Sequence, residues 1–140
     1  MRVTGYSDND GPTSTVIVTG AIGDFGKAVR IHSNQELDLQ LTRGSFGLNI
    51  AALESDLGSA IEGHFPTNTA TCSGEVSVSG GAAILTGSGT DAYQGLSGTL
   101  TMTITINEVE TPPRCPKTDT SPFLAQSVFI SGSGTVSIPH

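Results

Sequence analysis

Tryptophan is absent from this chain, and aromatic residues make up only 5% of its 140 residues. Sugars and nucleobases stack on aromatic side chains, so this scarcity argues against a stacking platform for either. Basic residues are also few: six lysines and arginines stand against 13 aspartates and glutamates, which leaves a net charge of −7. Nucleic acids and anionic membranes are bound through clustered cations, and we therefore expect neither as a partner.

Long apolar segments are missing as well. No run approaches the roughly 20 apolar residues that a membrane-spanning helix needs. The first ten residues, MRVTGYSDND, lack the apolar core of a signal peptide. We expect a mature extracellular domain that has lost its signal peptide, with a cytoplasmic protein as the alternative.

The chain has only two cysteines, Cys72 and Cys115, and each lies beside a turn-prone segment. An even pair in a chain rich in Ser, Thr and Gly is typical of one disulfide formed in an oxidising compartment, so we predict a Cys72–Cys115 bridge. Two separate thiols are the alternative. No further Cys or His lies at metal-ligand spacing from either cysteine, and we expect no metal.

The sequence does contain 18 glycines and several runs in which apolar and polar residues alternate. The clearest run is TLTMTITI at 99–106, where the four apolar side chains share one face and the threonines share the other. A period of two is the pattern of a half-buried antiparallel strand.

Similar runs, separated by Gly, Pro, Asn and Asp, predict eight to nine short strands. We place them at 14–22, 27–32, 36–43, 44–50, 74–78, 82–86, 96–107, 124–131 and 134–138. A short helix is expected within 51–61. The predicted fold is all-β: a single domain over residues 1–140 that forms an antiparallel barrel of about eight strands, with a β-sandwich as the alternative.

The inward faces of these strands would form an apolar wall. The residues that we predict to bind an apolar small molecule there are Leu37, Leu39, Leu41, Phe46, Leu48, Leu100, Met102, Ile104 and Ile106.

Glu108 continues the inward face of the run 99–106 at the point where that strand is expected to end. A carboxylate at the rim of an apolar cavity is partly desolvated, which raises its pKa toward the range useful for a general acid or base. Glu108 is therefore one candidate catalytic residue. The alternative is that the strand has already frayed there and the side chain points into water.

Tyr93 lies in the glycine-rich segment 87–98, GSGTDAYQGLSG, which leads into the same strand. This segment could fold over one end of the cavity, where the Tyr93 hydroxyl would orient a ligand oxygen. Tyr93 is the second candidate catalytic residue. The alternative is a structural tyrosine that packs on the backbone of its own loop.

The stretch 87–107 resembles a segment of allene oxide cyclase-like and dirigent-like β-barrels, including secreted actinobacterial members, in which a GTGxYxGxxG pattern precedes a long alternating strand. The matching residues are Gly87, Gly89, Thr90, Tyr93, Gly95 and Gly98. Ser88 and Asp91 depart from the pattern, and Thr90 is shifted by one position.

This resemblance implies an eight-stranded barrel with an apolar lumen, often assembled as a dimer or trimer, that works without a cofactor. Such proteins hold a flexible, reactive molecule in one conformation so that its cyclisation follows a single course. A cofactor-free cyclase or isomerase is therefore the first functional hypothesis. Two others stay open: a secreted ligand carrier, and an extracellular structural or adhesive domain whose core is filled by side chains.

Overall fold

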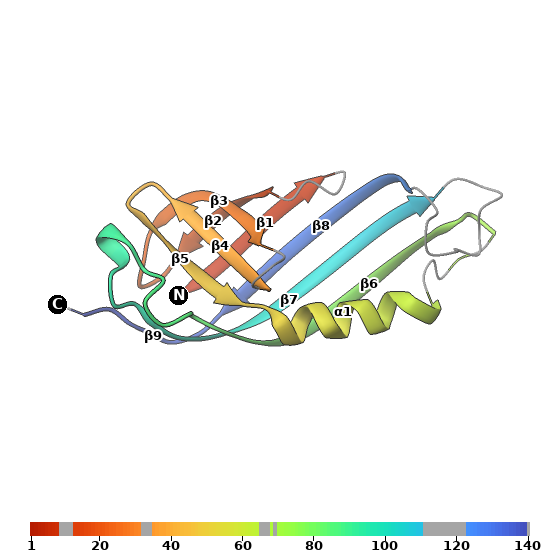
Figure 1. The fold of residues 1–140 in the computed structure, drawn as a ribbon. Helices are drawn as coiled ribbons and strands as arrows, with labels where there is room; N and C mark the ends of the chain where they lie inside the picture. The colour runs from red at the N-terminus through yellow and green to blue at the C-terminus, as the bar shows by residue number, and fades with distance from the viewer. Residues whose placement is uncertain (9–12, 32–34, 65–67, 69, 111–122, 140) are drawn as a thin grey trace.

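The computed structural model describes residues 1–8, 13–31, 35–64, 68, 70–110 and 123–139 (Figure 1). Its elements are β1 (Arg2–Asp8), β2 (Thr13–Thr19), β3 (Asp24–Ile31), β4 (Glu36–Leu41), β5 (Gly44–Asn49), α1 (Ala51–His64), β6 (Ser73–Ala83), the 3₁₀ turn η2 (Asp91–Tyr93), β7 (Ser97–Glu110), β8 (Phe123–Ser133) and β9 (Val136–Ser137). None of the helices within these ranges has the length and apolarity needed to cross a membrane.

The strands form one antiparallel sheet in the order β5-β4-β3-β2-β1-β8-β7-β6, and β9 pairs with the start of β7. The chain runs from β1 to β5 by successive neighbours, crosses through α1 to the opposite edge, and returns through β6 and β7 to place β8 beside β1. The sheet curls into a half-barrel (Figure 1). This confirms the predicted all-β, antiparallel, barrel-like fold.

Alternation of burial along most strands gives the sheet a concave face that carries the core and a more exposed convex face. Along β7, Leu100 and Met102 are buried, whereas Thr99 and Thr101 are exposed. The same alternation places Val16 and Val18 of β2 on the concave face.

Two strands differ from the sequence prediction. β1 was not predicted, because Gly5 and Ser7 occupy two of its inward positions and give no apolar alternation. β6 is one strand of 11 residues where two short ones were expected, since Gly80 and Gly81 resemble a turn. In the structure β6 pairs with β7 residue for residue, and Gly80 leaves room for Leu53 of α1.

The two edges of the sheet meet at one end, which we call the closed end. Leu48 of β5 forms an isolated bridge with Ile84, and the Leu85 amide donates to the Gly47 carbonyl at 2.9 Å. Beyond this bridge, loop hydroxyls cover the β5 edge. The Ser45 amide donates to Thr90 Oγ1, and the Gly47 amide donates to Ser88 Oγ, both at 3.0 Å. The glycine-rich loop therefore runs along the edge of β5 and hydrogen-bonds to its backbone.

The other end, where β7 finishes, is the distal end. There β6, β7 and β8 extend beyond the strands β1 to β5, and α1 runs alongside β6 (Figure 1). Leu53 of α1 is fully buried against the concave face of β6. An ion pair of 3.0 Å between Arg30 Nε of β3 and Glu54 Oε1 links α1 to the opposite wall.

A substitution at Gly89 tests whether the glycine-rich loop is packed closely, because a Cβ at that position would overlap the carbonyl oxygen of Tyr93. We expect Gly89→Ala to lower the free energy of unfolding by about 3 kcal/mol, as overpacking in a closed site does. Gly23→Ala is the control, since a Cβ there meets nothing within 4 Å, and it should change stability by less than about 0.5 kcal/mol. Urea unfolding measures both, and equal effects of the two variants would contradict the closed loop.

Candidate functional site

The nine residues predicted to bind a ligand lie together on the concave face, and Ile104 and Ile106 continue this group along β7 toward Glu108. Eight of them are buried members of a single hydrophobic core, and Leu41 packs against it. Phe46, Leu48 and Leu100 have no exposed surface at all. The structure thus gives these residues a packing role, as in small barrels whose interior is filled by side chains. Their role in ligand binding stays a prediction.

Tyr93 is buried within the closed end. Its ring packs edge-on against Phe46, with 5.5 Å between the ring centroids, and its hydroxyl donates a hydrogen bond to Asp24 Oδ2. Only 3% of the residue is exposed. The side chain therefore fixes the glycine-rich loop to the first residue of β3.

Asp24 is the centre of this arrangement. Its carboxylate accepts hydrogen bonds from the backbone amides of Phe25 at 2.8 Å, Arg43 at 3.2 Å and Thr42 at 3.3 Å. The Thr42 hydroxyl also donates to Oδ1, and Arg43 Nε lies 3.7 Å from Oδ2. Asp24 thereby ties the turn between β4 and β5 to the loop that carries Tyr93.

These contacts set the protonation of both groups. Burial alone would raise the pKa of Asp24, but the hydrogen bonds from Thr42, Tyr93 and the backbone outweigh it and hold the pKa well below its usual range. Burial and the bond to the Asp24 carboxylate raise the pKa of Tyr93 to about 12. At neutral pH Tyr93 is a protonated donor and Asp24 a charged acceptor, so the pair acts as a structural lock.

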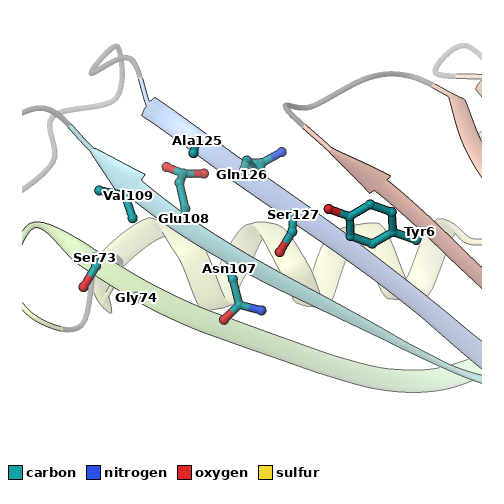
Figure 2. Close-up of a pocket in the computed structure, with 9 residues that line it drawn as sticks. All are labelled: Tyr6, Ser73, Gly74, Asn107, Glu108, Val109, Ala125, Gln126 and Ser127. Carbon is teal, nitrogen blue, oxygen red and sulfur yellow. The ribbon is translucent and has the colours of Figure 1, made fainter.

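The distal end carries a pocket of about 520 Å³. Strands β1, β6, β7 and β8 supply its lining: Tyr6, Ser73, Gly74, Asn107, Glu108, Val109, Ala125, Gln126 and Ser127 (Figure 2). Regular pairing between β7 and β8 ends here, at a register shift between Val109 and Glu110. Such irregularities re-aim side chains at the end of a strand pair.

Glu108 lies on the wall of this pocket. It follows Ile104 and Ile106 on the inward face of β7, as predicted, and only 7% of the residue is exposed. Its opposite neighbours are Gln126 on β8 and Gly74 on β6. In Figure 2, Glu108 and Gln126 point to one side of the β7–β8 pair, whereas Asn107 and Ser127 point to the other. Residues of both faces therefore contribute to the pocket.

The two candidate catalytic residues do not share a site. Tyr93 precedes the start of β7, whereas Glu108 is near its end, and residues 97 and 108 are separated by about 36 Å of extended strand. Glu108 lines the distal pocket, whereas Tyr93 forms the structural lock at the closed end by its hydrogen bond to Asp24.

Sequence reasoning missed Asp24 and Gln126. Asp24 falls between the predicted strands 14–22 and 27–32, although it begins β3 and shares its inward face with Ala28. Gln126 gives no signal of its own, because its position beside Glu108 depends on the register of two strands, β7 and β8, whose nearest ends, Glu110 and Phe123, are 13 positions apart in the sequence. Asn107 was overlooked although it adjoins Glu108.

Within the described ranges, His, Cys, Asp and Glu side chains do not gather into groups of three that could hold a metal ion. Cys72 is buried. Its predicted disulfide partner, Cys115, lies outside the described residues, so this bridge stays a prediction. No protein-family model, curated protein or solved structure matches the chain.

The lock predicts how stability depends on pH. Because the pKa of Asp24 is lower in the folded protein than the unfolded value of about 3.9, the ionised carboxylate stabilises the fold fully above that value. This stabilisation is lost as the pH falls toward the folded pKa. We expect Asp24→Asn to lower the free energy of unfolding at pH 7 by about 2 kcal/mol and to flatten its decline below pH 4.

Asp56→Asn is the matched control, since Asp56 is an exposed aspartate on α1 and lies outside the lock. It should leave the acid dependence of the wild type intact. If urea unfolding from pH 2.5 to 7 gave the wild type and Asp24→Asn the same slope, the lock would be refuted.

Proposed function

We propose that the protein binds a small organic molecule in the distal pocket, with an apolar body and at least one hydrogen-bonding group. The observation that carries this proposal is a pocket of about 520 Å³ that has the buried carboxyl residue Glu108 on its wall. Ligand sites commonly span about 300–1,000 Å³ and combine apolar walls with a few polar groups. The filled interior near the closed end leaves the distal end as the better place for a ligand.

The lining residues fit a molecule of this kind. Val109, Ala125 and the ring of Tyr6 offer apolar surface. The amide of Asn107 and the hydroxyl of Ser127 offer donors and acceptors that can fix the orientation of a polar group. The absence of a basic side chain among the nine lining residues favours a neutral ligand over an anion.

A second candidate function is cofactor-free isomerisation or cyclisation of the bound molecule. Glu108, which borders the pocket, is the candidate proton carrier, because a carboxylate can take a proton from one carbon or oxygen of a ligand and return it to another. The substrate would then be rearranged with no net gain or loss of atoms. The pocket would contribute by holding one conformer.

Filling the pocket should abolish binding. Ser127 lies on the pocket wall, and Ser131 lies on the same face of β8 outside it. We expect polyketide- and terpenoid-like compounds or a solvatochromic dye to raise the melting temperature of the wild type and of Ser131→Phe, since a ligand that binds only the folded state stabilises it. Ser127→Phe should show no ligand-dependent rise. Equal responses of the two variants would place binding elsewhere, and no response from the wild type would favour the structural or adhesive alternative.

Glu108→Gln separates a binding role from a catalytic one. Glu75 is the control, because it is an exposed glutamate on the neighbouring strand β6, opposite Asn107. If Glu108 transfers protons, Glu108→Gln should reduce turnover of a converted ligand at least 100-fold, as loss of a general acid or base does, and Glu75→Gln should not. Product formation is followed by chromatography and mass spectrometry, as a new peak whose mass equals that of the added ligand. Unchanged turnover in Glu108→Gln would contradict the catalytic role and leave a carrier.

A further inference from the structure

The convex face carries a second pocket, of about 210 Å³, at the place where β8 ends and β1 begins. Three neighbouring strands, β1, β8 and β7, supply its lining: Arg2, Thr4, Thr101, Thr103, Ser131, Gly132 and Ser133. We call this pocket the hydroxyl trough. It shares no lining residue with the distal pocket, and it is present whether or not that pocket binds a ligand.

The shape of the trough follows from the sizes of the side chains on its three strands. The strand register gives two rows of three outward residues: Arg2–Ser133–Thr101 and Thr4–Ser131–Thr103. Short serines on the middle strand β8 form the floor, and the longer side chains of β1 and β7 form the two walls. The next row holds the bulky pair Tyr6 and Phe129, which limits the trough on that side.

The guanidinium of Arg2 is the cation of the trough. Of the three arginines in the described ranges, Arg30 lies 3.0 Å from Glu54 and Arg43 lies 3.7 Å from Asp24. Arg2 has neither an ion pair nor a side-chain hydrogen bond with another described residue. Its positive charge is therefore not neutralised by a carboxylate of this part of the chain.

The trough also offers hydroxyl groups on two sides of Arg2. Thr103 Oγ1 is 2.8 Å from Ser79 Oγ of the neighbouring strand β6. The hydroxyls of Thr4, Thr101 and the two serines of the floor have no hydrogen-bond partner among the residues that the structure describes. Each of these groups can donate one hydrogen bond to a ligand.

The acidic positions of the convex face lie away from the trough. Asp8 is six residues from Arg2 along β1, and Glu75 pairs with a position of β7 that is six residues from Thr101. Six residues of extended strand span about 20 Å. Asp38 is on β4, and two strands lie between β4 and β1. Because exposed charges in 0.1 M salt are screened over about 10 Å, Arg2 dominates the potential at the trough.

We propose that the hydroxyl trough binds a sulfate or phosphate group, either as the free ion or as an ester at the end of a small molecule. The guanidinium of Arg2 presents a fork of N–H donors that matches two oxygens of such a group. The hydroxyls of the floor and of the opposite wall can donate to the remaining oxygens. Donors on both walls and on the floor suit the oxygens of a tetrahedral group, which do not lie in one plane, better than those of a planar carboxylate.

The size and charge of the trough restrict the ligand further. Its volume of about 210 Å³ is smaller than the roughly 300–1,000 Å³ of sites that enclose a whole organic ligand, so it suits a compact group. One guanidinium can neutralise one oxyanion, whereas a polyanion such as a nucleic acid needs clustered cations.

The test titrates isotope-labelled protein with sodium sulfate, sodium phosphate and glycerol 1-phosphate, with sodium chloride added to keep the ionic strength constant. Amide chemical shifts are followed. Arg2→Gln removes the charge of the trough, and Lys27→Gln makes the same charge change at an exposed lysine of β3 outside it. Thr101→Val removes one hydroxyl at nearly constant shape, and Thr99→Val does so at the preceding outward position of β7, which does not line the trough.

We expect saturable shifts at residues 2–4, 101–103 and 131–133, with a dissociation constant of about 1–10 mM because the trough is open to water. Arg2→Gln should raise this constant at least tenfold and Thr101→Val at least threefold, while Lys27→Gln and Thr99→Val stay within twofold of the wild type. Tighter binding of glycerol 1-phosphate than of inorganic phosphate would support an ester as the ligand, and equal binding would support the free ion.

Two results would overturn the proposal. One is that the amides of the trough shift no more with sulfate or phosphate than with chloride at the same ionic strength. The other is that Arg2→Gln and Thr101→Val bind the oxyanions as the wild type does, which would place the binding elsewhere on the protein.

Discussion

The closed end of the sheet depends on one carboxylate, that of Asp24. It accepts five hydrogen bonds, from three backbone amides and from the hydroxyls of Thr42 and Tyr93. These bonds join the start of β3, the turn between β4 and β5, and the glycine-rich loop. A buried charge is costly unless it is fully hydrogen-bonded, so the loop has to take this conformation for the sheet to close. With this end closed, the core beneath it is filled by side chains.

The consequence is a molecule with two different ends. Near the closed end, inward residues such as Phe46 and Leu100 are completely buried and pack against one another. At the distal end β6, β7 and β8 continue without the other wall, and a pocket forms where the register of β7 and β8 shifts. The chemistry that the chain offers is therefore concentrated at the end that the sheet leaves open.

The sequence predicted the sheet well where side chains alternate, as they do around Met102, and it placed Glu108 on the inward face of its strand. It could not predict β1, whose inward positions include Gly5 and Ser7, because burial of that strand comes from its two neighbours. The hydrogen bond between Tyr93 and Asp24 could not be predicted either. Asp24 and Tyr93 are 69 positions apart in the chain, and neither a period nor a motif connects them. Gln126 lies beside Glu108 only because of the register between β7 and β8.

The most direct test of the central claim is a titration of the isotope-labelled protein with the most stabilising compound, followed by amide chemical shifts. If the closed end is filled and the distal end binds the ligand, the largest changes in amide chemical shift will occur at residues 73–74, 107–109 and 125–127. The amide shifts of residues 44–48 and 90–96 will stay unchanged. Changes centred on the core residues of β4 and β5, with little at the end of β7, would contradict this account. They would show that a ligand enters the interior that we describe as filled.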